Sequence, residues 1–325
     1  MRFLVLSLCL LAASPMALAK PLVLILESYH QGFAWDACYT RGIRAVLGDC
    51  CRIEKFEMDT KRLPETAYAA QADKAWQKIQ TLRPDLVISG DDNALRLVGP
   101  KLANRNIPLV FLGINQDPKS YFNNTLPANV TGLLERPLML RNISGIHQWL
   151  PQARRLLVLF DTETTSRIAA REVFRNQASL TLSGLRVDLK LVGQWQDWQR
   201  TVREAKQSGY DAIAVGLYQH VFDQQKNVDA DTVLRWTSQN STVPLFGFWD
   251  FAVGRDKTIG GLLLGGEAHG REAGEIAKAI LNGQRPADIP PKVGTRGQLI
   301  FSRSQLARFG IRLPQAVAAM ASYVD

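Results

Sequence analysis

The chain has 325 residues, of which 46% are hydrophobic and 21% charged, a composition typical of a folded protein with a sizeable core. Its length favours two domains over one. The formal net charge is +9, but the Lys and Arg residues are scattered and form no run typical of a nucleic-acid-binding arm. Nucleic acid is therefore excluded as the expected partner.

The first 19 residues have the pattern of a secretory signal peptide. Arg2 gives a short basic start, residues 3–13 are apolar, and residues 17–19 read Ala-Leu-Ala, a small-x-small cleavage site. We expect cleavage after Ala19 and export to the periplasm; the alternative is an uncleaved N-terminal anchor. No later stretch approaches the roughly 20 apolar residues that a membrane-spanning helix needs.

Export would permit disulfides, and the mature chain keeps Cys38, Cys50 and Cys51. Because three is an odd number, at least one thiol has no partner within the chain. If residues 35–47 form a helix, Cys38 lies about 18 Å along its axis from the next strand, which disfavours a bridge to either neighbour. The Cys and His residues form no cluster at metal-ligand spacing, so we expect neither a metal nor another cofactor.

From residue 21 the sequence alternates short aliphatic runs with amphipathic helical patterns. Strands are expected at 21–27, 52–59, 84–92 and 107–115, and helices at 34–48, 65–82 and 93–105. Such alternation predicts βαβ units and a parallel sheet covered by helices on both faces. We assign residues 20–130 to this N-terminal α/β lobe.

The same pattern restarts after a polar, turn-rich segment at 115–132. Strands are expected at 154–164, 185–193, 210–219 and 243–250, and helices at 165–180, 195–209 and 229–241. Residues 131–259 therefore form a C-terminal α/β lobe, and about 260–325 is expected to cross back and complete the first lobe. The predicted fold class is α/β, with two Rossmann-like lobes of parallel sheets joined by a multi-strand hinge.

Ligands of parallel α/β sheets bind beyond the carboxyl ends of the strands. This rule selects residues 28–30, 59, 91–93 and 113–115 in the first lobe, and 161–165, 216–219 and 248–251 in the second. Two such crevices facing each other would form one cleft that can close.

Two adjacent carboxylates, Asp91 and Asp92, stand between an aliphatic strand and a helical pattern. Asp is a favoured N-cap because it accepts backbone N–H bonds that the first helical turn leaves free. A helix needs only one cap, so one Asp is expected to cap and the other, by our prediction Asp92, to face the cleft. A shift of one residue in the helix start exchanges these roles. By the same reasoning Asp161 is available beside the threonines that follow it, and Asp250 closes the last strand of the second lobe.

Carboxylates thus gather at the strand ends of a chain whose total charge is positive. This pattern favours a ligand with an amine or several hydroxyls over a phosphate, while a free carboxylate on the ligand would find helix N-termini. Aromatic rings near the same ends can stack a ring or hold a cation, although the ring of Trp35 belongs equally well to the core. The predicted ligand-binding residues are Ser28, Tyr29, Trp35, Asp91, Asp92, Asn115, Asp161, Thr162, Tyr218, Trp249 and Asp250.

Several stretches together resemble the ABC-transporter substrate-binding family with a type 1 periplasmic binding protein fold. They are ESYHQGFAWDACYTRGIRAVL, FEMDTKR, RPDLVISGDDNAL, IPLVFLGIN, AKAILNGQRPADIPP and LIFSRSQLARFGIRLPQAV. The variant closest in pattern also serves as an extracytoplasmic sensor beside histidine kinases and cyclic-dinucleotide enzymes. Several family members carry a longer aliphatic-aspartate run where this chain has FEMDTKR, yet Asp59, Lys61 and Arg62 stand at the matching places.

The resemblance implies a periplasmic solute-binding protein without catalysis, which closes over an amino acid, an amine or a polyhydroxy compound. Its partner would be an ABC permease or a membrane sensor protein. The alternative hypothesis is an exported hydrolase on the same α/β scaffold. The sequence supports it less, because it contains neither a G-x-S-x-G elbow nor a reactive Cys with an evident His partner.

Overall fold

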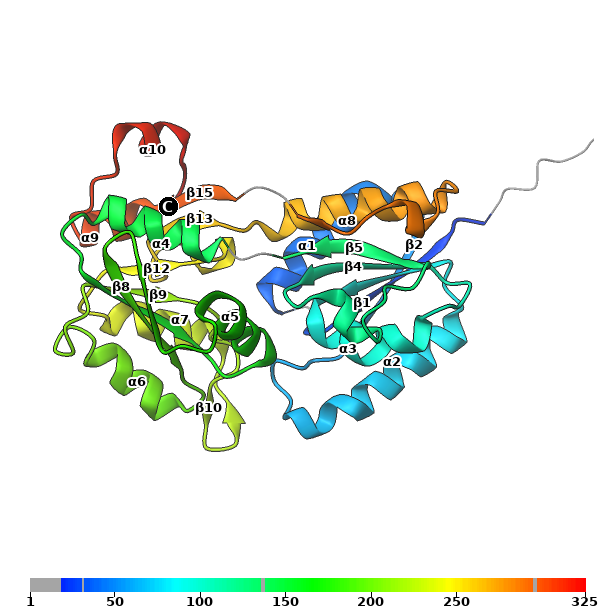
Figure 1. Cartoon of the computed structure of the whole chain (residues 1–325), viewed down its shortest axis with the longest axis horizontal. Coiled ribbons are helices and arrows are strands. Elements are labelled where there is room, and N and C mark those ends of the chain that lie inside the picture. Colours follow the sequence, from blue (N-terminus) through cyan, green and yellow to red (C-terminus); the bar gives the residue numbers. More distant parts are fainter. Residues whose placement is uncertain (1–18, 31, 136–137, 295–296) are drawn as a thin grey trace, which may run out of the picture.

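A computed structural model describes residues 19–30, 32–135, 138–294 and 297–325, which form two α/β lobes side by side (Figure 1). The predicted two-lobed α/β fold is confirmed. The predicted signal peptide lies outside the described residues, apart from Ala19. No helix among the described residues is both long enough and apolar enough to cross a membrane.

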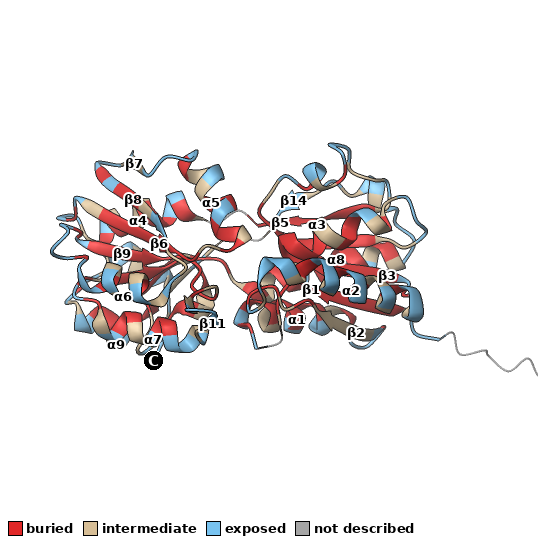
Figure 2. Ribbon diagram, turned by 90° about the horizontal axis from the view of Figure 1, so that it is seen from below, coloured by how far each residue is buried: buried red, intermediate tan, exposed pale blue. Residues whose placement is uncertain are grey.

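The first lobe is built on a six-stranded parallel sheet in the order β14-β5-β4-β3-β1-β2. Its strands are β1 (Leu22–Glu27), β2 (Arg52–Glu57), β3 (Leu86–Gly90), β4 (Leu109–Ile114), β5 (Val130–Leu134) and β14 (Lys292–Val293). Its helices are α1 (Ala34–Leu47), α2 (Tyr68–Leu82), α3 (Asp91–Leu102) and α8 (Gly266–Leu281). Figure 2 shows the buried strands at the centre of this lobe.

Alternating side chains of β1 explain why helices cover both faces of this sheet. Val23 and Ile25 pack in one core with residues of α1 and α8, whereas Leu24 and Leu26 pack in a second core with residues of α2 and α3. Because successive side chains of a strand point to opposite faces, a strand that is apolar throughout must be buried on both sides. The continuous run LVLIL therefore fixes β1 at the centre of the lobe.

The second lobe contains a five-stranded sheet in the order β12-β9-β6-β8-β7, parallel except for the edge strand β7. Its strands are β6 (Arg155–Phe160), β7 (Ser179–Leu182), β8 (Leu185–Leu191), β9 (Ala212–Val215) and β12 (Leu245–Gly247). Its helices are α4 (Met139–Trp149), α5 (Thr164–Phe174), α6 (Trp195–Arg203) and α7 (Ala230–Asn240). A short hairpin of β10 (Phe222–Asp223) and β11 (Lys226–Asn227) projects beyond the sheet.

The last part of the chain is divided between the lobes. Helix α8 packs along α1, where an added Cβ at Gly42 would lie only 2.1 Å from the carbonyl oxygen of Glu267, and β14 extends the first sheet. The strands β13 (Gly260–Leu263), β15 (Gln298–Ser302) and β16 (Ser322–Val324) instead form a small sheet, in which β13 packs against β12 and α4 of the second lobe. The helices α9 (Arg303–Arg308) and α10 (Gln315–Met320) lie on the same side (Figure 1).

The sequence expectation for about 260–325 therefore matches α8 and β14, whereas β13 and the residues after Gly297 pack with the second lobe. The first lobe also extends beyond residue 130, because β5 pairs with β4. The chain passes between the lobes after β5, between β13 and α8, and between β14 and β15 (Figure 1).

The three cysteines in the described part of the chain, Cys38, Cys50 and Cys51, form no disulfide. Cys38 lies on α1, beside Gly266 at the start of α8, and accepts a hydrogen bond from Arg41. The adjacent thiols of Cys50 and Cys51 lie 3.2 Å apart in the turn before β2.

Candidate functional site

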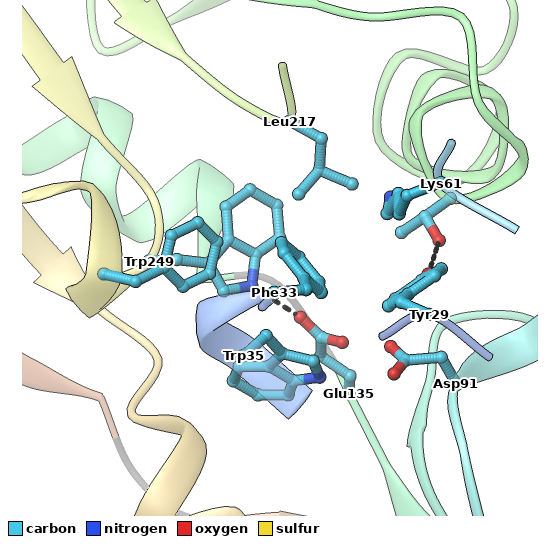
Figure 3. A pocket seen from close by; sticks show the side chains of 10 residues that line it. Tyr29, Phe33, Trp35, Lys61, Asp91, Glu135, Leu217 and Trp249 are labelled. Atoms are coloured by element: carbon cyan, nitrogen blue, oxygen red, sulfur yellow. Dashed lines mark hydrogen bonds between the residues drawn. The ribbon is translucent and has the colours of Figure 1, made fainter. Parts of the chain in front are cut away.

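The carboxyl ends of strands from both lobes surround a cavity of about 230 Å³, including space open to solvent. Tyr29 and Asp91 follow β1 and β3 in the first lobe, whereas Leu217 and Trp249 follow β9 and β12 in the second. The complete lining is Tyr29, Phe33, Trp35, Lys61, Asp91, Glu135, Thr165, Leu217, Trp249 and Phe251, and Figure 3 shows these side chains.

Asp91 brings a buried carboxylate to this cavity. Its Oδ2 atom has no hydrogen-bond partner, and the residue is only 2% exposed. An added Cβ at Gly113, which has φ +72°, would lie 3.0 Å from Asp91 Oδ1, so a glycine is needed beside the carboxylate. Burial raises the pKa of Asp91 well above its usual range, and the charges of Asp36 and Glu135 raise it further. The nearby Lys61 ammonium lowers the pKa of Asp91, but it does not outweigh these effects, so the ionised form of Asp91 is disfavoured.

Glu135 is the second carboxylate of the cavity, and it lies where the chain leaves β5 for the other lobe. Its Oε1 accepts a hydrogen bond of 2.8 Å from the indole N–H of Trp249 (Figure 3). Its Oε2 accepts one of 3.1 Å from Asn115. Burial raises the pKa of Glu135 to about 7, although these two hydrogen bonds lower it. The two donors come from different lobes and fix the carboxylate in position.

Aromatic rings form most of the remaining wall. Phe33 meets Tyr29 edge-on at a centroid distance of 5.0 Å, and it meets Phe251 of the opposite lobe at 5.6 Å. Phe251 in turn stacks on Trp249 at 6.3 Å. These apolar faces suit a ring or an aliphatic chain, while the two carboxylates suit a cationic group.

A set of polar contacts, here called the interlobe clamp, holds the two lobes together beside the cavity. Lys61 of the first lobe and Glu163 of the second form an ion pair of 3.1 Å, and both side chains are at most 1% exposed. Asn93 donates to Glu163 at 2.9 Å, and the hydroxyls of Tyr29 and Thr165 lie 3.0 Å apart. These five residues define the clamp, and the three contacts just given cross from one lobe to the other.

The electrostatics of the clamp favour the ionised pair. Burial disfavours the Lys61 ammonium, but the charges of Glu163 and Asp161 outweigh this effect and raise the pKa of Lys61. Burial likewise works against the Glu163 carboxylate, yet Lys61 and the backbone N–H of Thr165 lower its pKa below the usual range. Glu163 also caps α5, because its Oε2 accepts the Thr165 N–H at 2.9 Å.

Four of the residues predicted from the sequence line the cavity: Tyr29, Trp35, Asp91 and Trp249. A fifth, Asn115, supports the site from behind through its hydrogen bond to Glu135.

The prediction that Asp92 faces the cleft while an Asp caps the helix is wrong. Asp92 accepts hydrogen bonds from the backbone N–H groups of Asn115 and Gln116, each at 3.1 Å, and from the Tyr121 hydroxyl at 2.9 Å. Neither Asp side chain caps α3. Instead the Ser28 hydroxyl, from the end of β1, accepts the Ala94 N–H at 2.8 Å. Asp92 therefore anchors the loop after β4, and Asp91 is the carboxylate in the cavity.

The other predicted residues do not line the cavity. Ser28 is fully engaged in the cap and in a bond to the Gly90 carbonyl, and Asp161 accepts bonds from Ser166, Glu163 and His220. Thr162 packs near Gly193, Tyr218 lies in the core of the second lobe, and Asp250 lies beside Gly265 at the crossing into α8. Their positions after strands are as expected, but their side chains point elsewhere.

The sequence interpretation missed six lining residues: Phe33, Lys61, Glu135, Thr165, Leu217 and Phe251. Three of them, Thr165, Leu217 and Phe251, fall inside segments that the strand-end rule selects, and Lys61 stands in the FEMDTKR stretch. Glu135 was not predicted because the strand before it was not recognised from the sequence. That strand follows a long polar segment. In the described part of the chain, no group of three or more His, Cys, Asp or Glu side chains could hold a metal ion.

Two α/β lobes that close over a small enclosed cavity at their strand ends define the class of bilobal solute-binding proteins. A family model described as "ABC transporter substrate binding protein" matches residues 53–325, so the chain belongs to that family. The fold is that of type 1 periplasmic binding proteins. No curated protein matches the sequence.

Solved structures share this fold at low sequence identity. The ABC domain from Streptococcus pneumonia in complex with L-Trp has a TM-score of 0.69 and 19% identity, covering 94% of this chain and 100% of that one. A conserved domain protein from Vibrio cholerae has a TM-score of 0.69 and 16% identity over the same shares of the two chains. CD0873, a substrate binding protein from Clostridium difficile solved in a ligand-free, open form, has a TM-score of 0.63 and 17% identity, covering 94% and 99%.

We predict that Lys61→Met opens the lobes in the absence of ligand. Removing one member of a buried ion pair costs about 3–5 kcal/mol when the other stays buried, and opening returns Glu163 to water instead. The radius of gyration from small-angle X-ray scattering should therefore increase. Lys101→Met is the control, because Lys101 pairs with Asp73 at 2.7 Å on the exposed surface of one lobe. An unchanged radius of gyration in Lys61→Met would show that the clamp does not hold the closed form.

Proposed function

We propose that this chain is a periplasmic solute-binding protein that closes over an amine-bearing small ligand and does not act as a catalyst. The observation that carries the proposal is the pair of buried carboxylates, Asp91 and Glu135, in a cavity whose other lining residues are five aromatic residues, Leu217, Thr165 and Lys61, which is paired with Glu163. Two like charges in one enclosed space disfavour each other, and a ligand ammonium would compensate both. A neutral sugar or an anion would leave this repulsion in place.

The other groups of the cavity support an aromatic amino acid as the ligand. The rings of Trp35, Trp249 and Phe251 can take an aromatic side chain, and the ligand ammonium would lie toward Asp91 and Glu135. A Lys ammonium has three donors, so Lys61 can offer one to the ligand carboxylate while it keeps its bond to Glu163. The structural similarity to a domain solved with L-Trp agrees with this ligand class.

A screen by thermal shift tests this function. L-tryptophan, L-tyrosine and L-phenylalanine should stabilise the mature protein, whereas glucose, citrate and phosphate should not. Asp91→Asn should weaken binding of the stabilising amino acid by roughly 10- to 100-fold, because a hydrogen bond to a charged group contributes about 1.5–3 kcal/mol. Isothermal titration calorimetry measures this loss directly.

The control for the Asp91 variant is Asp73→Asn, which removes one negative charge from an exposed position of the same lobe. It should bind with unchanged affinity. Stabilisation by anionic compounds alone would contradict the proposed ligand class, and turnover of any tested compound would favour a hydrolase instead.

Affinity should depend on pH through Glu135. Its pKa of about 7 in the empty cavity means that binding of an ammonium must displace a proton at lower pH. The displaced proton opposes binding, so Kd should rise by about tenfold for each unit that the pH falls below 7, and should level off above pH 8. Titrations between pH 5.5 and 8.5 measure the effect, and Glu135→Gln should flatten the profile.

We further propose that the mature protein acts in the periplasm and presents its closed form to a membrane partner, either an ABC permease or the outer domain of a sensor protein. Family membership supports an extracytoplasmic role, and the two lobes change their joint surface when they close. Deleting the gene should abolish uptake of the ligand if the partner is a permease. With a sensor as partner, uptake of radiolabelled ligand should persist while the signalling response to the ligand is lost.

A further inference from the structure

A second, larger cavity adjoins the first and shares Phe33 and Lys61 with it. It measures about 740 Å³, including space open to solvent, and is here called the vestibule. The vestibule is lined by His30, Gly32, Phe33, Lys61 and Arg62 of the first lobe and by Gln219, Asn227, Asp229, Ala230 and Asp231 of the second. Seven of these ten residues are polar or charged, and Arg62, Asp229 and Asp231 are exposed. The vestibule thus differs in chemistry from the aromatic cavity behind it.

Phe33 and Lys61 are the residues that line both spaces. The Phe33 ring is 5% exposed and spans the cleft, since it meets Tyr29 of its own lobe at 5.0 Å and Phe251 of the other at 5.6 Å. Lys61 lies behind it, with Nζ 5.6 Å from the centre of the Phe33 ring. Phe33 and Lys61 together separate the two cavities and are here called the partition. Because Lys61 is bound to Glu163, Phe33 is the member of the partition that can be replaced without breaking the ion pair.

We propose that Phe33 sets the length of the ligand, and that the vestibule is a latent subsite for a ligand extended on its carboxyl side. The inference rests on the proposed function, in which the ligand ammonium lies at Asp91 and Glu135. The ligand carboxylate then lies toward Lys61 and therefore toward the partition. A residue added to the carboxyl end of the ligand would contact the Phe33 ring.

The vestibule offers suitable groups for such an extension. A dipeptide adds a peptide amide and moves the carboxylate outward, toward the polar lining beyond Phe33. His30 and Arg62 are basic groups on one wall, although Arg62 also pairs with Asp59 at 2.7 Å, and Gln219 offers an amide on the opposite wall. An extension on the amino side gains nothing from this space, because it would displace the ammonium from the two carboxylates.

The test compares the aromatic amino acid that binds the wild type most tightly with its dipeptide carrying glycine on the carboxyl side, for example L-tryptophan with L-tryptophylglycine. The measured quantity is the ratio of the two dissociation constants. We expect the wild type to bind the amino acid and to disfavour the dipeptide by at least 100-fold. Phe33→Ala should lower this ratio at least tenfold, even if both ligands bind more weakly, and should not improve binding of glycyl-L-tryptophan.

Phe251→Ala is the matched control, because it also removes a phenyl ring from the cavity wall but does not line the vestibule. Its ratio should stay close to that of the wild type. An unchanged ratio in Phe33→Ala, or an equal decrease in both variants, would overturn the proposal. A wild type that binds none of the aromatic amino acids would instead contradict the proposed function itself, and circular dichroism of each variant verifies that it is folded.

Discussion

The closed structure depends on one buried ion pair, Lys61 with Glu163, which joins the two lobes. Removing two charges from water is unfavourable unless each finds its partner at good distance and further hydrogen bonds satisfy the remaining atoms. Glu163 meets this condition by accepting bonds from Lys61, Asn93 and the Thr165 backbone. Since two of these donors belong to the opposite lobe, Glu163 is satisfied only when the lobes are closed.

The charges in the clamp stabilise the closed form of the protein, whereas the buried carboxylate charge in the cavity destabilises it. In the clamp, the charges compensate each other, whereas burial and the charge of Glu135 both disfavour the ionised Asp91 in the cavity. Closure without ligand therefore gains the ion pair but leaves the Asp91 carboxylate in an unfavourable environment. A ligand ammonium removes that penalty only in the closed form, and this difference in interaction between the two forms is what allows a ligand to shift their populations.

The sequence predicted the fold well because its main signals are local. Aliphatic runs such as LVLIL and the amphipathic helices between them follow from periodicity, and the order of elements then limits the topology. The site was predicted less well, since positions after strands were identified but not the directions of their side chains. Tyr29, Asp91 and Trp249 turn into the cavity, whereas Asp161 and Tyr218, also after strands, turn into the lobe. Glu135 was missed because recognising β5 requires its pairing with β4, which is a long-range contact.

The misassigned aspartates show why local rules fail at this site. The rule that Asp caps a helix considers only the residues of one segment, but the cap of α3 comes from Ser28, at the end of a neighbouring strand. With the cap supplied from outside, Asp91 adopts a left-handed backbone conformation, φ 66°, at the first position of the helix, and its carboxylate stays free of the helix N–H groups. Such a conformation is unfavourable for a residue other than glycine and persists only where its surroundings fix it. Here Ser28 on one side and Asp92, bound to the loop after β4, on the other hold the turn in place. The adjacent aspartates thus have separate tasks, and the anchoring of Asp92 is the reason that Asp91 can face the cavity.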